Sequence, residues 1–234
     1  MAQDQQTLPQ SPGLPDGAVS GAAKYMVGMF FVGYTLNFMD RQIVSVLLEA
    51  IKEDLQISDG RLGLLTGLAF AAFYASMAVP IAWLSDRYNR KRIIAACMVL
   101  WSAATAAFGL AQNFTQMLLA RMAVGVGEAG YAPAGFSMIA DYFPREKRAT
   151  ATAIGAMGAM LGQMLGLVLG GFIVQHYGWR AAMLIAGLPG VLFALLFLVT
   201  VREPRRGMSG GAAAGAKSAS SSFLDLGRNA PYLF

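Results

Sequence analysis

Long apolar runs separated by short polar connections dominate the sequence. Six stretches are long enough to cross a bilayer core of about 30 Å, which takes roughly 20 apolar residues of helix. They are Tyr25–Leu48, Leu62–Leu84, Ile93–Gln112, Met117–Tyr142, Thr150–Val174 and Ala181–Val201. Their apolar residues are continuous rather than alternating, so they do not fit the strands of a β-barrel. We predict an all-α membrane protein, a bundle of six transmembrane helices in which neighbours are antiparallel because the connections are short.

The composition supports this class. Hydrophobic residues make up 56% of the chain and charged residues 13%, whereas a soluble domain carries about a quarter of charged residues. The basic residues recur in short bursts, so the net charge of +5 does not indicate a nucleic-acid partner. We interpret the single cysteine, Cys97, as a buried apolar residue and the single histidine, His176, as a solvated loop residue. No serine–histidine or metal-ligand constellation is present, so we expect no enzyme, no cofactor and no metal.

The distribution of basic residues predicts the orientation in the membrane. If the N-terminus is cytoplasmic, thirteen of the 18 Lys and Arg residues fall in cytoplasmic segments and two lie within spans. Three fall on the opposite side, namely Lys52, Arg61 and Arg180. This asymmetry follows the positive-inside rule. We therefore predict a multi-pass protein of the plasma (inner) membrane with a cytoplasmic N-terminus.

The segments outside the bundle have a different composition. Residues 1–22 are rich in Gln, Pro, Gly and Ser and lack the features of a secretory signal, so we predict a disordered cytoplasmic tail. The bundle is predicted to occupy 23–206. Residues 207–234 begin with Gly, Ala and Ser and are predicted to be a central cytoplasmic linker. The last twelve become apolar again, as if approaching another span, so we expect either a fragment or a need for a second polypeptide.

Four charged residues lie inside predicted spans: Asp40 and Arg41 in the first, and Arg121 and Glu128 in the fourth. One charge at the bilayer centre costs about 2.5–3.5 kcal/mol, so four isolated charges would cost roughly 10 kcal/mol. They must therefore face one another, water or a substrate. Arg121 and Glu128 are seven residues apart and share a helix face. Asp40 and Arg41 diverge by about 100°, and both are within reach of Asn37.

We expect Arg41 to pair with Glu128 across the helices, which leaves Asp40 toward a cavity or a second partner. One interpretation is a buried ion pair that only fixes packing. The other is a proton or substrate relay, in which a carboxylate beside an arginine stays ionised until the cavity is desolvated or the arginine moves away. We favour the relay, because four charges at one depth exceed what helix register needs. Glu128 is our first candidate for the titrating group.

Glycines concentrate in two of the spans. The segment Gly125-Val-Gly127-Glu-Ala-Gly130 matches a dinucleotide-binding pattern, but it lies in an apolar run with no preceding strand. We interpret it as a site of close helix packing, with a kink at Pro133. The fifth span carries three overlapping G-x-x-x-G units formed by Gly158, Gly162, Gly166 and Gly170. This ridge favours tight packing, and a bending or sliding surface is the alternative.

The most specific motif is Ala82-Trp-Leu-Ser-Asp86-Arg87-Tyr-Asn89-Arg90-Lys91-Arg92. Positive-inside anchoring does not explain an acid, Asp86, beside four bases. The segment resembles the loop between helices 2 and 3 of the major facilitator superfamily, G-x-x-x-D-R-x-G-R-[RK], with Ala82 and Asn89 in place of the usual glycines. The resemblance implies that this loop latches a cytoplasmic gate through Asp86, Arg87, Arg90 and Lys91.

Further segments resemble the spinster branch of that superfamily, the proton-linked sphingolipid and lysolipid carriers. They are Asn37-Phe-Met-Asp40-Arg41, Arg121-x3-Gly125-x-Gly127-Glu128-Ala129, Gly178-Trp179-Arg180 and Arg202-Glu203-Pro204. The resemblance covers residues 25–206, the N-terminal half of the family fold. It implies a central coupling cluster of Asp40, Arg41 and Glu128, and a second six-helix bundle, or a second chain, that completes the substrate cavity.

The expected function is secondary active transport by alternating access. The partners would be the lipid bilayer, protons and an amphipathic, lysolipid-like substrate. An organic-anion/proton symporter is the alternative within the same class, because Arg41 or Arg121 is able to bind a carboxylate. A non-transporting scaffold or lipid-binding half-unit is the alternative from a different class.

Overall fold

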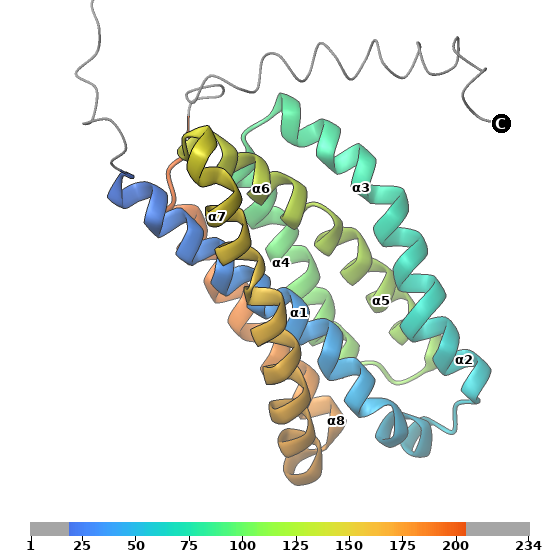
Figure 1. Ribbon diagram of the computed structural model, residues 1–234. Helices are drawn as coiled ribbons and strands as arrows, with labels where there is room; N and C mark the ends of the chain where they lie inside the picture. Colours follow the sequence, from blue (N-terminus) through green and yellow to red (C-terminus); the bar gives the residue numbers. More distant parts are fainter. Residues whose placement is uncertain (1–18, 205–234) are drawn as a thin grey trace, which may run out of the picture.

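The computed structural model describes residues 19–204, which form a bundle of helices (Figure 1). The elements in chain order are α1 (Gly21–Leu55), α2 (Asp59–Gly63), the π-helical turn η1 (Leu64–Leu68), α3 (Ala69–Arg87), α4 (Arg90–Gly109), α5 (Phe114–Ala129), α6 (Tyr131–Tyr142), α7 (Arg145–Ala156) and α8 (Gly158–Thr200). The predicted linker, 207–234, lies outside the described residues, as does most of the predicted tail. Of that tail, Gly21 and Ala22 form the first turn of α1.

The helices follow the six predicted spans. The first lies in α1, the second runs through α2, η1 and α3, and the third is α4. The fourth is divided between α5 and α6, which meet at Gly130, three residues before Pro133. Proline is tolerated in the first turn of a helix, where its missing N–H leaves no bond unmade. The fifth span is α7 with the first part of α8. The sixth is the rest of α8, because Gly178, at φ 77°, interrupts the helix and the chain reverses there (Figure 1).

Three continuous helical stretches in the described part of the chain are long and apolar enough to cross a membrane by themselves. They are Asp59–Arg87, Arg90–Gly109 and Arg145–Thr200. The last has 56 residues and contains two passes, one on each side of Gly178. The α1 helix, with polar residues in its middle, and the divided fourth pass are less apolar or less continuous. Their stability in a membrane therefore depends on partners for their polar groups.

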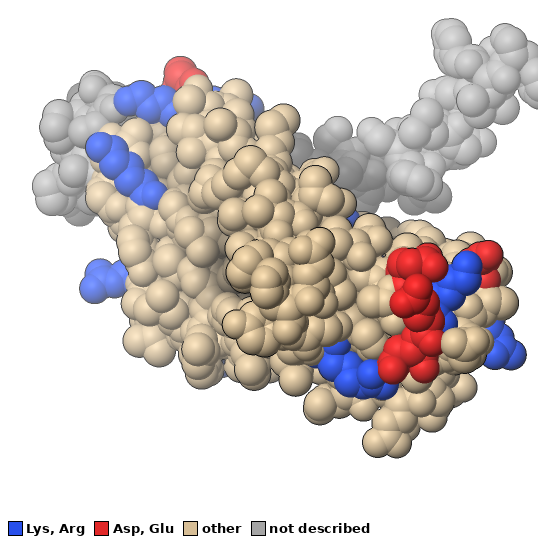
Figure 2. Space-filling view, turned by 90° about the horizontal axis from the view of Figure 1, so that it is seen from below, with Lys and Arg blue, Asp and Glu red and all other residues tan. Residues whose placement is uncertain are grey.

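The outer surface of the bundle is also typical of helices in lipid. Large apolar side chains are exposed along α3 and α8, including Val79 (75%), Leu192 (69%) and Val199 (82%). Figure 2 shows Lys, Arg, Asp and Glu gathered toward the edges of the face it presents, with other residues filling the middle. An apolar surface of this extent is disfavoured in water and suits a bilayer.

The glycine ridge of the fifth span packs directly on α1. Gly158, Gly162, Gly166 and Gly170 are all buried. A Cβ added to Gly166 would lie 2.8 Å from both the carbonyl oxygen of Met39 and Cβ of Gln42. Bare glycine therefore lets the two backbones approach more closely than any side chain would permit. This geometry supports the packing interpretation of the ridge.

We expect Gly162→Ala to lower the free energy of unfolding by about 1–3 kcal/mol, the usual cost of overpacking. The added methyl group would meet backbone N of Met39 and Cβ of Phe38 at 3.0 Å, so α1 would have to move. Gly171→Ala is the matched control, because nothing lies within 4 Å of the added atom. Thermal unfolding in micelles measures both. Equal Tm values for the two variants would show that the ridge does not need a bare backbone.

One sequence-based assignment was wrong: His176 does not lie in a loop. It occupies the last helical turn before Gly178, where Nδ1 lies 2.8 Å from the carbonyl oxygen of Phe172. Its ring also stacks on the ring of Phe172, with centroids 4.4 Å apart. The helix continues past the apolar run by about one turn, so the polar residues there do not mark the connection. Cys97 is buried, as predicted.

Candidate functional site

Two helices bring the intramembrane charges into one region of the bundle, and a third adds a hydroxyl group. Asp40 and Arg41 lie on α1, and Arg121 and Glu128 lie two turns apart on α5. The exposed fractions of Asp40, Arg121 and Glu128 are only 2%, 5% and 1%. The α4 helix contributes Thr105 to the same region. Charges this deeply buried are stable only when each is paired or hydrogen-bonded.

The structure contains the predicted ion pair between Arg41 and Glu128. Nε of Arg41 donates to Oε2 of Glu128. The side chain of Glu128 is 0% exposed, whereas that of Arg41 is 26% exposed. The pair therefore joins a fully enclosed carboxylate to a guanidinium that reaches open space. A ligand or solvent can approach the arginine without passing the carboxylate.

Aromatic rings surround the arginine side of this pair. The guanidinium carbon of Arg41 lies 5.0 Å from the ring centroids of Phe38 and Phe70 and 4.8 Å from that of Tyr74. Arg121 lies 4.6 Å from the ring of Phe70, so this one ring contacts two cations. Such contacts stabilise a partly desolvated guanidinium. Sequence reasoning missed Phe70 and Tyr74, although their i, i+4 spacing in the second span was an available signal.

Asp40 has a second partner instead of facing a cavity, the other arrangement that the sequence left open. Oγ1 of Thr105 donates to Oδ2 of Asp40 at 3.3 Å. The carboxylate is buried against α4, because it points about 100° away from Arg41 around the helix. Asp40 and Arg41 therefore contact different helices.

Asn37, which the helical spacing places within reach of Asp40 and Arg41, has its side chain beside the carboxyl group of Glu128. Its side chain is buried on the same helix, but Asp40 and Arg41 are engaged by α4 and α5. Six buried side-chain atoms of residues 19–204 lie outside hydrogen-bond distance and angle of any partner, and four of them belong to predicted site residues: Nδ2 of Asn37, Oδ1 of Asp40, Nε of Arg121 and Oε1 of Glu128. Such atoms are uncommon and are typical of sites that bind a proton or polar ligand group. No three His, Cys, Asp or Glu residues of this described part are grouped to hold a metal.

The motif between the second and third spans lies at the end of the bundle where basic residues gather, which we call the basic end. Only Tyr88 and Asn89 separate α3 from α4. Oδ1 of Asn89 accepts from the backbone N–H of Arg92 and caps α4, a role that suits asparagine where the family has glycine. Asp86 and Arg87 are exposed, and Arg87 stacks 3.9 Å from the ring centroid of Trp83.

Arg90 ties this motif to two other passes. Its side chain is 4% exposed, with Nη1 lying 2.6 Å from Oδ2 of Asp141 on α6 and Nε 3.0 Å from Oε1 of Glu203 after α8. Glu203 also accepts from the backbone N–H of Lys91 at 2.7 Å. Lys91 therefore contributes its backbone to the network. Sequence reasoning missed Asp141, for which an acid at the end of an apolar run, next to a basic segment, was the signal.

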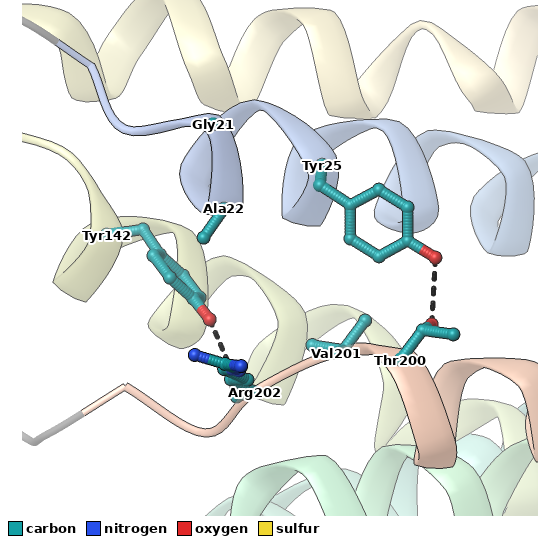
Figure 3. Close-up of a pocket in the computed structure, with 7 residues that line it drawn as sticks. All are labelled: Gly21, Ala22, Tyr25, Tyr142, Thr200, Val201 and Arg202. Carbon is teal, nitrogen blue, oxygen red and sulfur yellow. Dashed lines mark hydrogen bonds between the residues drawn. The ribbon is translucent and has the colours of Figure 1, made fainter.

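The ends of α1, α6 and α8 meet beside this network around a cavity of about 250 Å³ (Figure 3). The hydroxyl of Tyr25 donates to Oγ1 of Thr200 at 2.8 Å. The hydroxyl of Tyr142 donates to the carbonyl oxygen of Arg202 at 2.5 Å. Together with the Arg90 network, these bonds hold the basic ends of four passes in one arrangement.

A second polar cluster holds the opposite end of the bundle. Asp54, near the end of α1, accepts hydrogen bonds from Arg180 and, at 3.2 Å, from Nε1 of Trp179. Both donors follow Gly178, so the cluster joins the first pass to the turn between the fifth and sixth. The hydrogen bond from Arg180 holds the pKa of Asp54 below its ordinary value.

This lowered pKa predicts a pH dependence of stability. A depressed carboxyl pKa stabilises the fold at neutral pH, and the stabilisation is lost as pH falls below about 4, through the folded-state pKa. We expect Asp54→Asn to lower Tm slightly at pH 7, and the wild-type Tm to approach that of the variant below pH 4. Asp86→Asn, at an exposed position at the other end of the bundle, is the control. A wild-type-to-variant difference that is the same at both pH values would contradict this account.

Comparison with known proteins identifies the family. The model of the Major Facilitator Superfamily matches residues 30–234. The chain belongs to this superfamily. It is 36% identical over 175 residues to an MFS-type efflux pump of Mycolicibacterium smegmatis, a match that covers 75% of this chain and 41% of that protein. It is 31% identical over 214 residues to the sphingosine-1-phosphate transporter SPNS2 of Danio rerio, covering 88% of this chain and 42% of that protein.

A solved structure shows the same relationship within the superfamily. It is a bacterial homologue of the human lysosomal transporter Spinster in an inward-facing, occupied conformation, 37% identical to this chain with a TM-score of 0.77. The match covers 85% of this chain and 49% of that chain. The chain thus has the fold of the N-terminal six-helix half of a spinster-like major facilitator superfamily member. It spans less than half the length of the curated relatives named above.

Proposed function

We propose that the chain forms part of a proton-coupled transporter that moves an amphipathic or lipid-like substrate by alternating access. The observation that carries this proposal is the Arg41–Glu128 ion pair, which is enclosed at the carboxylate and open at the guanidinium. A membrane-embedded carboxylate of this kind is costly to keep and marks a functional site by default. Membership of the superfamily supports transport as the activity, and the geometry of the Arg41–Glu128 pair supports its coupling to protons.

In the proposed cycle, protonation of Glu128 removes the negative charge that holds Arg41. The guanidinium is then available to an anionic group of the substrate, and release of the proton draws Arg41 back to the carboxylate. Asp40 stays hydrogen-bonded to Thr105 on α4 and keeps α1 in register. Phe70 contacts both Arg41 and Arg121, so a movement of one arginine shifts the ring against which the other packs. Binding of a proton to Glu128 and binding of substrate to Arg41 thus favour each other.

The surroundings of Arg41 support an amphipathic substrate. A guanidinium binds phosphate or carboxylate oxygens in a fork, and three aromatic rings beside it offer apolar contact to a hydrocarbon chain. A relative named as a sphingosine-1-phosphate transporter carries a substrate of this type. An organic-anion/proton symporter is the second candidate, because the same exposed guanidinium is able to bind a small carboxylate.

We further propose that the basic end faces the cytoplasm. There it would form the cytoplasmic gate by closing against a second six-helix half. Arg90 is bound within this bundle by Asp141 and Glu203. Asp86 and Arg87 are exposed and thus placed to meet that partner when the gate closes. The excess of basic residues at this end supports the orientation.

Transport in proteoliposomes tests the proposal. The protein, expressed from its own gene, is reconstituted and an imposed pH gradient drives uptake of either a fluorescent lysolipid or a small dicarboxylate. We expect lysolipid flux that follows the gradient and stops with a protonophore. Dicarboxylate flux alone would favour the organic-anion symporter. Lysolipid binding without any flux would favour a lipid-binding half-unit and overturn the transport proposal.

A further inference from the structure

A groove of about 570 Å³ runs along the outer side of α4 and α8. Where these helices pack together, the short side chains of Ala96, Ala103 and Ala194 leave space between the longer Leu100 and Leu195. The lining is apolar except at one end, where Arg92 lies in the first turn of α4. The groove thus has one cationic end and an apolar remainder.

The groove is separate from the charged cluster. Arg92, Ala96, Leu100 and Ala103 recur every three to four residues and share one face of α4. Thr105, which contacts Asp40, lies about 200° around the same helix from Ala103. The groove therefore opens on the opposite side of α4 from the coupling residues, and the inference does not depend on the proposed function.

The length of the groove matches one leaflet of a bilayer. Eleven residues separate Arg92 from Ala103, which corresponds to about 16 Å of helix. Half of a hydrocarbon core is about 15 Å thick. Arg92 is exposed at the basic end, and none of the ion pairs among residues 19–204 includes it. Its long side chain is able to reach the headgroup level while its methylene groups stay in the apolar region.

We propose that this groove binds one anionic phospholipid from the leaflet at the basic end. Arg92 contacts the phosphate oxygens, and one acyl chain follows the alanines toward Ala103. The occupant is chosen by charge complementarity, because a guanidinium at the head of an apolar groove pairs with an anionic headgroup in its bidentate geometry. A second copy of the chain is disfavoured, since a two-fold dimer through this face in one membrane would bring two Arg92 side chains together.

Native mass spectrometry of the purified full chain tests this site. The chain in micelles is titrated with phosphatidylglycerol or with phosphatidylcholine of the same acyl chains. We expect Arg92→Gln to weaken phosphatidylglycerol binding about fivefold, the factor for roughly 1 kcal/mol per basic residue beside an anionic lipid. Phosphatidylcholine binding should weaken less, because its choline cation offsets the charge of the phosphate that Arg92 contacts. Arg145→Gln, which removes another exposed charge of the basic end outside the groove, is the matched control and should bind both lipids like the wild type.

A second variant tests the apolar part of the site. Ala96→Phe should fill the groove and weaken binding of both lipids, with unchanged helicity by circular dichroism. Equal affinity of the wild type for the two lipids, or an Arg92→Gln variant that binds like Arg145→Gln, would overturn the proposal. A dimer that Ala96→Phe dissociates would also overturn it, since the occupant would then be a second copy.

Discussion

Arg90→Ala is expected to lower the free energy of unfolding of the bundle by about 3–5 kcal/mol, the cost of breaking a buried ion pair by removing one partner. The substitution removes the cation that lies 2.6 Å from Asp141, whose side chain is only 5% exposed. It also removes the contact of Arg90 with Glu203. Three passes lose their common anchor at the basic end, so unfolding in a denaturing detergent should begin at much lower concentration.

Two further variants separate charge from position. Arg87→Ala, three positions away, removes an exposed arginine whose described contact is the ring of Trp83, and it should cost less than about 1 kcal/mol. The double variant Arg90→Met with Asp141→Leu should recover part of the lost stability, because the fully buried carboxylate is removed together with its partner. Glu203, which is 22% exposed, keeps its hydrogen bond from the backbone N–H of Lys91. If Arg90→Ala unfolds like Arg87→Ala, the network at the basic end does not stabilise the fold as we describe.

Glu128→Gln is expected to reduce proton-driven accumulation of substrate to the level of empty liposomes. Glutamine keeps the size of the side chain but neither accepts a proton at neutral pH nor pairs as an anion with Arg41. Counterflow of substrate in the absence of a pH gradient should persist, because Arg41 then stays available to the substrate. Both rates are measured with the same proteoliposomes.

Two controls accompany this measurement. Glu53→Gln removes an exposed acid near the end of α1 and should leave accumulation unchanged. Circular dichroism and gel filtration establish that Glu128→Gln folds, which we expect since Arg41 keeps its three aromatic contacts. Unchanged proton-driven accumulation by Glu128→Gln would refute the coupling role of this residue.

The spans and the central ion pair were predictable from the sequence for one physical reason. A bilayer demands about 20 apolar residues per crossing, so the six passes are visible as runs. The bilayer also makes an unpaired charge energetically costly. Arg41 and Glu128 each interrupt an apolar run, so an ion pair between them was the expected arrangement. The packing role of the glycine ridge was also predictable, because glycines repeated every four residues on a membrane helix allow another helix to approach closely.

Other features depend on tertiary geometry that no local pattern specifies. The sequence left open whether Asp40 faced a cavity or a second partner, and only the packing of α4 against α1 brings Thr105 to it. Asn37 was placed within reach of its helical neighbours, but the packing of α5 brings the carboxyl group of Glu128 beside it. Asp141 was missed because several arginines lie at the basic end, and only the packing of α6 beside α4 selects Arg90 as its partner. Long-range pairings of this kind follow from how helices cross.

Infrared difference spectroscopy of the chain in lipid detects protonation of Glu128 itself, because a buried carboxylate gains a carbonyl band when it binds a proton, with no need for transport. Spectra recorded at neutral and acidic pH are subtracted for the wild type, Glu128→Gln and Glu53→Gln. All three proteins should show carbonyl bands of other protonated carboxyl groups on acidification. We expect one further component, from Glu128, that is present in the wild type and in Glu53→Gln and is missing in Glu128→Gln. Difference spectra of Glu128→Gln and the wild type with the same carbonyl intensity would contradict the assignment of Glu128 as the titrating group.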